Sequence, residues 1–192
     1  RQIYSYLVDY FKNRNILKKR KINALVTAGP TREYIDPVRF ISNESSGKQG
    51  YEIALALSKI GVKTTLIVGP SETRAMVAKD LKIKKVQTAD QMLDQVKKLL
   101  PVDIAVCTAA VSDFKVKEFS NEKIKKNKLN YIKLEKNIDI LSYLGKNNKL
   151  RPRIVVGFSA ETENLIKNSF NKLKEKYCDL IIANDVSKKN IG

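Results

Sequence analysis

The sequence contains no histidine, no tryptophan and only two cysteines in 192 residues. Without histidine there is no Ser-His-Asp triad, no Cys-His pair, no imidazole general base and no HExxH metal site. Two widely separated cysteines form neither a disulfide framework nor a thiolate zinc cluster. Any catalysis must therefore depend on positioning, on cations, on backbone dipoles, or on Asp, Lys and Asn side chains. Chemistry on phosphates fits that restriction well.

Long apolar runs are also absent, because no segment approaches the roughly 20 residues that a membrane-spanning helix needs. The hydrophobic fraction of 43% and the charged fraction of 30% are typical of a globular protein. Cys107 and Cys178 both lie against apolar, strand-like runs, which favours buried free thiols over reactive ones. The sequence thus indicates one domain in a reducing cytoplasm.

The charge is strongly unbalanced, with 37 Lys and Arg residues against 20 Asp and Glu residues and a formal net charge of +17. Such a balance raises the possibility of nucleic-acid binding. Only eight of the basic residues are arginine, however, and the lysines are scattered along the chain without interleaved aromatic residues. A lysine-rich solvated surface is the favoured interpretation, and it would still attract anionic substrates.

Strand-like and helix-like segments alternate from residue 22 onward. Helical spacing of apolar residues predicts helices at 48–60 and 89–100, and a third with Ile166, Phe170, Leu173 and Tyr177 on its apolar face. Apolar runs predict strands at 23–29, 63–69, 82–87 (an edge strand), 103–110, 153–160 and 179–184. This order predicts an α/β, Rossmann-like fold with a mostly parallel sheet and helices on both faces.

Two segments depart from the alternation. Residues 111–137 are charged, lysine-rich and without a core face, which predicts an extended functional flap. Residues 1–21 carry Ile3, Leu7, Val8 and Phe11 at helical spacing, followed by a basic stretch, which predicts a linker helix ahead of a main domain at 22–192. Because the first residue is Arg, we expect the chain to be a piece of a longer polypeptide.

Candidate ligand-binding residues follow the strands, since ligands of open parallel sheets bind beyond the carboxyl ends. The segment SSGKQG (45–50) opens a helix and offers backbone N–H groups to a phosphate, although Ser45 could simply cap that helix. This segment is neither a Walker A motif nor GxGxxG. Asp113, the lysines of EKIKK, Phe158, and the i,i+4 pair Lys172 and Lys176 are the other candidates.

These residues occur within motifs that, in order, resemble the phosphopantothenoylcysteine synthetase family. The motifs are ALVTAGPTREYIDPVRFISNESSGKQG, TLIVGPS, AAVSDF, EKIKK, KNIDIL, VVGFSAET and DLIIANDVS, and the resemblance covers residues 23–192. It implies ligation of 4′-phosphopantothenate with cysteine in coenzyme A biosynthesis. In the bacterial form, CTP first gives an acyl-cytidylate and pyrophosphate, and the cysteine amine then displaces CMP.

The resemblance also implies site residues. Lys123 corresponds to the lysine required for forming the cytidylate. Asn43 and Arg39 correspond to residues that engage the phosphopantothenoyl group, chiefly in the second half-reaction. Phosphopantothenate would contact Arg39, Asn43, Ser45, Ser46, Gly47 and Ala110, and CTP would contact Asp113, Lys123, Ile138, Asp139, Ile140, Leu141, Phe158, Lys172 and Lys176. Mg²⁺ would accompany CTP, with no dedicated metal ligands, and the flap and the Arg39 loop would form a homodimer.

Some positions depart from the family pattern: Glu44 stands where His is usual, Gln49 where Met is frequent, and Ile138 where Pro is usual. In bifunctional members, an FMN-dependent decarboxylase domain precedes this one, so FMN is expected only in that domain. We expect further C-terminal strands beyond residue 192. Two alternatives are kept open, an NAD(P)-binding Rossmann domain of an oxidoreductase and a basic nucleic-acid-binding module.

Overall fold

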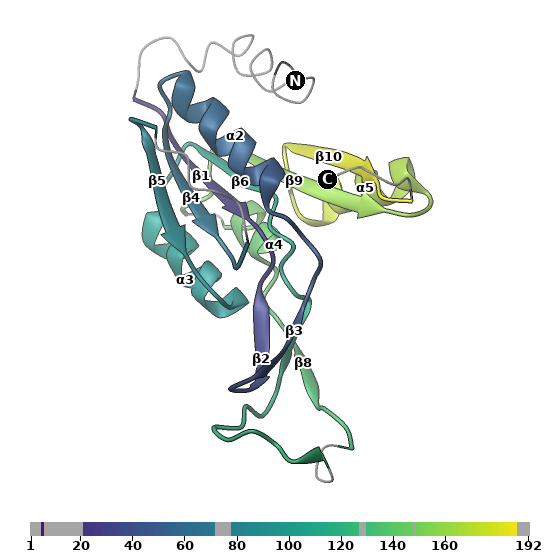
Figure 1. Cartoon of the computed structure of the whole chain (residues 1–192). Helices are drawn as coiled ribbons and strands as arrows, with labels where there is room; N and C mark the ends of the chain where they lie inside the picture. The colour runs from purple at the N-terminus through teal and green to yellow at the C-terminus, as the bar shows by residue number, and fades with distance from the viewer. Residues whose placement is uncertain (1–4, 6–20, 72–77, 127–129, 148, 188–192) are drawn as a thin grey trace.

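A six-stranded parallel sheet forms the centre of the molecule (Figure 1). The computed structural model describes Ser5 and residues 21–71, 78–126, 130–147 and 149–187. The strand order is β10-β9-β6-β1-β4-β5, and every neighbouring pair is parallel. The strands are β1 (Asn23–Ala28), β4 (Lys63–Val68), β5 (Leu81–Lys85), β6 (Ile104–Cys107), β9 (Ile154–Glu161) and β10 (Leu180–Asp185). The predicted Rossmann-like class is confirmed.

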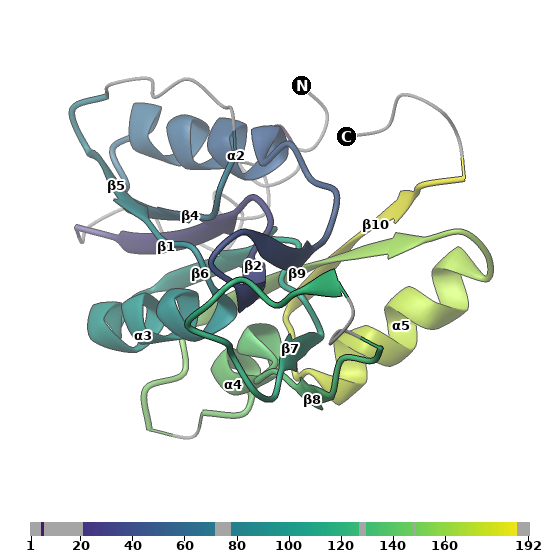
Figure 2. The ribbon, with the colours of Figure 1, turned by 60° about the horizontal axis from the view of Figure 1, so that its bottom comes forward.

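Helices cover both faces of the sheet, as Figure 2 shows with α2 on one side and α3 and α4 on the other. The helices are α2 (Lys48–Lys59), α3 (Ala89–Leu99), α4 (Ile140–Gly145) and α5 (Leu165–Glu175). Alternate residues of each central strand point to opposite faces. Val26 of β1 therefore joins the core beneath α2, whereas Leu25 joins the core beneath α3 and α4. Both side chains are fully buried.

A narrow arm extends from the carboxyl end of this sheet (Figure 1). We define the arm as residues 31–42 together with residues 114–136. It contains two antiparallel pairs, β2 (Arg32–Asp36) with β3 (Arg39–Ser42), and β7 (Phe114–Val116) with β8 (Leu134–Lys136). The sequence predicted loop and flap here, because these short strands lack the apolar runs that mark the sheet strands. Backbone hydrogen bonds pair these strands, and among their residues Glu33, Ile35 and Asp36 of β2 are buried.

Three other predictions need correction or fall outside the structure. The predicted apolar face of α5 is largely exposed, and Ile166, Phe170 and Tyr177 face solvent. The helix α5 packs on β9 and on β10, and β10 is the last strand of the described sheet. The strand predicted at 103–110 ends at Cys107. The predicted linker helix at 1–21 lies almost wholly outside the described residues. Within the described residues, no helix has the length and apolar character to cross a membrane.

Candidate active site

A cavity of about 510 Å³ lies where four sheet strands end. Its lining includes Thr27 from β1, Cys107 from β6, Phe158 and Ser159 from β9, and Asn184 from β10. All four strands are parallel, so these residues gather at one edge of the sheet. This is the position at which open α/β sheets bind ligands.

The segment between β3 and α2 forms one wall of the cavity through Asn43, Glu44, Ser45 and Gln49. The Asn43 amide donates to the backbone oxygens of Ala110 and Val111 at 3.3 and 3.1 Å. Asn43 thereby joins this wall to the loop that follows β6. Its Nδ2 group lies at the cavity surface, where an amide donor can reach a bound carbonyl.

The start of α2 differs from the expected capping arrangement. The N-cap residue is Gly47, with a φ of +73°, and no side chain caps the helix there. Ser45 Oγ and Ser46 Oγ instead accept from the backbone N–H of Gly47 and Lys48 at 3.4 and 3.3 Å. Ser45 lines the cavity, whereas Ser46 and Gly47 do not. Ser46 Oγ thus satisfies the first N–H of α2, and Gln49 in the first turn of the helix lines the cavity.

Gly50 serves packing rather than ligand contact. A Cβ atom at this position would lie 2.2 Å from Thr108 Oγ1 and 2.6 Å from Ala28 Cβ. Only glycine lets α2 approach the ends of β1 and β6 so closely. This close approach brings the 43–49 wall against the 108–113 loop.

Two loops form the opposite wall, and backbone hydrogen bonds hold them together. The Asn137 N–H donates to Asp113 O at 2.9 Å, and its Nδ2 donates to Ser112 O at 2.9 Å. Asp139 then caps α4 by accepting from the Ser142 N–H at 2.7 Å. Ile138 is exposed between these two anchors. The segment 138–141 thus lies along the cavity with its backbone fixed at both ends.

Two lysines, Lys172 on α5 and Lys176 at the C-cap of α5, lie at or next to the cavity. Lys172 lines the cavity, whereas Lys176 forms an ion pair with Asp139, with Nζ and Oδ2 2.9 Å apart. Burial raises the pKa of Asp139, but the Ser142 N–H and Lys176 outweigh it and the net pKa is lowered. The hydrogen bond to Asp139 raises the pKa of Lys176. Both groups are therefore charged near neutral pH, and Lys172 is the cation directly available to a ligand.

Ser159 and Glu161 make a small network at the end of β9. Ser159 Oγ donates to Glu161 Oε1 at 2.5 Å, and Asn168 Nδ2 donates to Glu161 Oε2 at 2.9 Å. These hydrogen bonds, that of Ser159 first, lower the pKa of Glu161. The network ties α5 to β9 and so positions Lys172 beside Phe158, which lies in the same lining.

Both cysteines are free, as the sequence indicated. Burial raises the pKa of Cys107 to about 12 and that of Cys178 to about 11. Neither is a thiolate near neutral pH, so neither is an activated nucleophile. Cys107 contributes to the cavity wall as a small apolar group.

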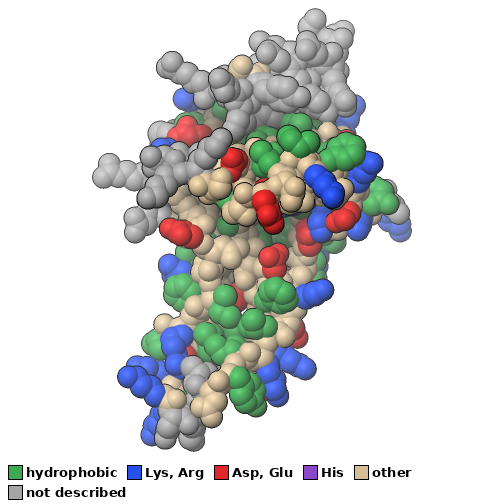
Figure 3. Space-filling view, turned by 90° about the vertical axis from the view of Figure 1, so that its right-hand side faces the viewer, with side chains coloured by type: hydrophobic (Ala, Val, Ile, Leu, Met, Phe, Trp, Pro, Cys, Tyr) green, Lys and Arg blue, Asp and Glu red, His purple; other side chains and the backbone are tan. Residues whose placement is uncertain are grey.

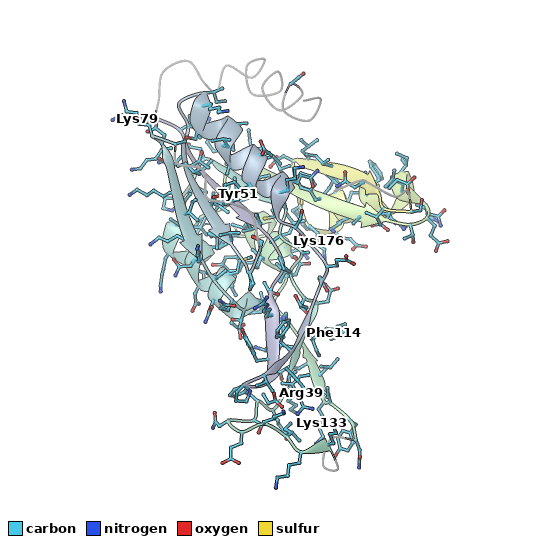
Figure 4. All side chains as sticks on the ribbon, in the orientation of Figure 1. Arg39, Tyr51, Lys79, Phe114, Lys133 and Lys176 are labelled. Atoms are coloured by element: carbon cyan, nitrogen blue, oxygen red, sulfur yellow. The ribbon has the colours of Figure 1, made fainter. Side chains whose placement is uncertain are left out.

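The two remaining predicted cations lie on the arm and not in the cavity lining. Figure 4 shows Arg39 near the far end of the arm, well away from Lys176. Arg39 donates through Nε to Asp36 and through Nη2 to both Asp36 and Ile124 O. Lys123 precedes Ile124 and is exposed. Within one copy of the chain, these cations do not meet the residues predicted to bind CTP.

The structure thus divides the predicted site residues into two groups. The cavity brings together Asn43, Ser45, Ala110, Asp113, Ile138, Asp139, Ile140, Leu141, Phe158 and Lys172. Outside its lining are Arg39, Ser46, Gly47, Lys123 and Lys176. Sequence reasoning missed the lining residues Asn137, Ser159 and Asn184, of which Ser159 and Asn184 follow the same strand-end rule that identified Phe158.

Comparison with known proteins agrees with this architecture. Residues 18–192 match the family model described as the DNA/pantothenate metabolism flavoprotein C-terminal domain. The chain is 43% identical over 189 residues to the coenzyme A biosynthesis bifunctional protein CoaBC of Borreliella burgdorferi, covering 96% of this chain and 47% of that protein. The CoaBC of Haemophilus influenzae is 42% identical, with 97% and 46% covered. The chain spans about half the length of these curated relatives.

Solved structures show the same fold. The crystal structure of the C-terminal domain of a CoaBC protein superposes with a TM-score of 0.75 at 38% identity, covering 87% of this chain and 79% of that one. A Cab2 mutant in complex with phosphopantothenate-cysteine shares the fold with a TM-score of 0.70 at 18% identity, covering 95% of this chain and 78% of that one. Fold, strand-end cavity and relatives together show that this chain belongs to the DNA/pantothenate metabolism flavoprotein C-terminal domain family.

Proposed function

We propose that this chain is a CTP-dependent phosphopantothenate–cysteine ligase of coenzyme A biosynthesis. The observation that carries the proposal is the strand-end cavity, which gathers ten of the predicted substrate and nucleotide residues, nine of them from four separate motifs and the tenth, Lys172, from α5. The relatives named for coenzyme A biosynthesis, and the neighbour whose complex contains phosphopantothenate-cysteine, support the substrate class.

In the first half-reaction, a carboxylate oxygen of phosphopantothenate attacks the α-phosphorus of CTP, and pyrophosphate leaves. The product is an acyl-cytidylate with a new acyl–oxygen–phosphorus bond. Both reactants are anionic, so the step needs cations to offset their charges. Lys172 would supply one of these charges within the cavity, Asp113 would accept hydrogen bonds from the ribose or base, and Phe158 would stack on the base.

In the second half-reaction, the cysteine amine attacks the acyl carbon, CMP leaves, and the amine proton is released. This step needs a polarised carbonyl and two reactants held together. Asn43 is one of the amide side chains in the cavity wall, and its Nδ2 already donates to the carbonyl oxygens of Ala110 and Val111. A bound acyl oxygen would take the place of such a carbonyl as the acceptor.

Magnesium would enter with the nucleotide. The described residues hold no group of three or more His, Cys, Asp or Glu side chains that could bind a metal ion. Mg²⁺ typically takes one or two carboxylates together with substrate phosphates. Both oxygens of Asp139 are engaged, one by the Ser142 N–H and one by Lys176, so Glu44 and Asp113 are the lining carboxylates that fit this role. Bound there, the ion would neutralise phosphate charge, and no FMN is assigned to this domain.

We further propose that the active unit is a homodimer in which the arm of each copy reaches the cavity of its partner. Arg39 and Lys123 lie outside the lining of their own cavity, and the arm exposes large apolar side chains (Figure 3). Those side chains are Val38, Phe40, Phe114, Phe119, Tyr131, Ile132 and Leu134. A two-fold interface would cover this surface and would bring Arg39 to the phosphopantothenate and Lys123 to the triphosphate in the partner's cavity.

The alternative functions have less support. In dinucleotide-binding Rossmann domains a short glycine-rich turn joins the first strand to its helix. Here the hairpin β2–β3 stands between β1 and α2. A thermal-shift panel with CTP, ATP, NADPH and a single-stranded oligonucleotide separates the three hypotheses. The ligase hypothesis predicts that CTP gives the largest stabilisation, and a larger shift with NADPH or the oligonucleotide would contradict it.

The direct test is pyrophosphate release. The chain is incubated with phosphopantothenate, Mg²⁺ and either CTP or ATP, with and without cysteine. We expect release that depends on phosphopantothenate and is faster with CTP. Faster release with ATP at equal concentration would overturn the nucleotide assignment, and release with neither nucleotide would overturn the proposed function for this chain.

A further inference from the structure

The arm contains one fully buried carboxylate, Asp36, at the end of β2. Its Oδ1 accepts from the backbone N–H groups of Val38 and Arg39 at 3.0 and 2.9 Å, which closes the turn between β2 and β3. Its Oδ2 accepts from Arg39 Nε at 2.9 Å, from Arg39 Nη2, and from the Ile124 N–H at 3.1 Å. The two hydrogen bonds to Oδ1 are sufficient to close the turn, so the hydrogen bonds to Oδ2 are not needed for it.

Oδ2 and Arg39 together hold both backbone polar groups of Ile124. Asp36 accepts from its N–H, and Arg39 Nη2 donates to its oxygen at 2.8 Å. A second link lies four residues earlier, where the Ser120 N–H donates to Ile35 O at 3.1 Å. Residues 120–124 are thus anchored to β2 at both ends, and the exposed Lys123 lies between the anchors.

The Asp36 carboxylate also offsets positive charge on the arm. Arg39 binds the backbone of Ile124, and lysines at 123, 125 and 126 flank that residue, so positive charges that repel one another lie on the same segment. Asp36 places a negative charge among them. The Arg39 guanidinium holds the pKa of Asp36 well below its usual range, so the carboxylate stays ionised near neutral pH. Of the five guanidinium N–H groups, the two on Nη1 have no acceptor among the described residues.

We propose that Asp36 is a positioning residue that fixes Arg39 and the Lys123 segment as one unit. The proposal rests on the ligase function, in which Lys123 is assigned to cytidylate formation and Arg39 to the phosphopantothenoyl group. A single carboxylate then sets the geometry of two cations that serve different half-reactions. Its loss should slow both half-reactions, whereas loss of either cation should slow chiefly its own.

The test compares Asp36→Asn with Asp94→Asn, a control at an exposed carboxylate on α3. Hydrogen–deuterium exchange is measured on peptides covering 118–126 and on peptides from β1, β4 and β6. In Asp36→Asn we expect exchange at 118–126 to rise about tenfold while the sheet peptides are unchanged. Misplacing a catalytic group by about 1 Å can cost roughly 10²-fold, so kcat for pyrophosphate release should fall by about that factor with little change in KM for CTP. CMP release from preformed acyl-cytidylate on adding cysteine should also slow.

A second variant tests the same hydrogen bond from its donor side and leaves Asp36 unchanged, in case Asp36→Asn does not fold. Ile124→Pro removes the N–H that donates to Asp36 and keeps both charged partners. It also fixes φ at 124 and restricts the preceding residue, so Ile132→Pro, which makes the same backbone change elsewhere in the arm, is its control. We expect Ile124→Pro to slow pyrophosphate release more than the control does. Unchanged exchange at 118–126 and unchanged kinetics in Asp36→Asn would overturn the inference while leaving the function intact. If the wild type releases no pyrophosphate, the function fails, and the exchange measurement alone decides the positioning role.

Discussion

The sheet body and the arm use their apolar side chains in opposite ways. In the body, the central strands β1, β6 and β9 bury nearly every side chain between two helical layers. In the arm, large apolar side chains face solvent, and the most deeply buried charged group is Asp36. The body can therefore fold on the free energy of its own core, whereas the arm keeps its shape through polar contacts and leaves apolar surface for a partner. The cavity belongs to the body, and the two distant cations belong to the arm.

The largest expected effect is a loss of unfolding free energy when the core of the body is disrupted. Leu25 is fully buried in the core beneath α3 and α4, so Leu25→Ala should cost about 2–5 kcal/mol of unfolding free energy through lost burial and a cavity. Leu134 on the arm is 47% exposed. Leu134→Ala should cost less than about 1 kcal/mol. Urea denaturation of both variants measures the difference, and equal losses would contradict the division into body and arm.

The second effect removes the arm's chemistry while the body stays folded. Lys123→Gln should lower pyrophosphate release by roughly 10²-fold or more, since losing a charge-stabilising contact costs about 3–4 kcal/mol. Lys117→Gln, at another exposed lysine of the arm, is the matched control. Circular dichroism should show both variants folded. Comparable rates in the two variants would mean that Lys123 has no special role.

The third effect concerns assembly. Phe119 on the arm and Phe170 on α5 are 55% and 53% exposed, so they form a matched pair. Phe119→Asp should shift the homodimer toward monomer at tens of micromolar, because it places a charge in the proposed apolar interface, while Phe170→Asp should not. Light scattering measures the mass. A wild-type monomer, or dissociation of the Phe170 variant alone, would place the interface elsewhere or remove it.

The smallest expected effect is a pH dependence of stability that comes from Asp36 on the arm. Asp36 has a lowered folded-state pKa, so it stabilises the fold fully above the ordinary value of 3.8 and loses this contribution as the pH falls through the lower folded-state value. The difference in melting temperature between wild type and Asp36→Asn should therefore be constant near neutral pH and should narrow in acid. Asp94→Asn should show no such narrowing. If the melting-temperature difference between wild type and Asp36→Asn widened as the pH falls, a lowered pKa of Asp36 in the folded state would be contradicted.

Much of the body could be predicted from sequence, because its strands are apolar runs and its helices have regular apolar spacing. The strand-end rule likewise identified Asp113 and Phe158 before their position was known. The arm could not be predicted in the same way. Asp36 followed by Pro37 is typical of a turn, and nothing local to it indicates that the carboxylate also binds the backbone of Ile124, 88 residues later in the chain. The position of Lys176, paired with Asp139, depends on similar long-range contacts.

The exposed apolar face of α5 shows that residue spacing alone does not predict burial. Ile166, Phe170 and Tyr177 have the spacing of a buried helical face, yet they face solvent in the described structure. Spacing reports that a face is apolar and does not report what lies opposite it. Burial is decided by the neighbouring elements, and here α5 lies over β9 and the outermost described strand, β10.

The central claim is that Lys123 of the arm and Asn43 of the body act in successive steps of one reaction, and the acyl-cytidylate tests it most directly. Asn43→Asp replaces the amide donor of the body with a carboxylate that cannot polarise the acyl carbonyl. The intermediate should form and then persist. Each variant is incubated with CTP, Mg²⁺, phosphopantothenate and cysteine, and the mixture is analysed by mass spectrometry. The account predicts acyl-cytidylate in the Asn43→Asp sample and none in the Lys123→Gln sample. Accumulation in both samples, or in neither, would contradict it.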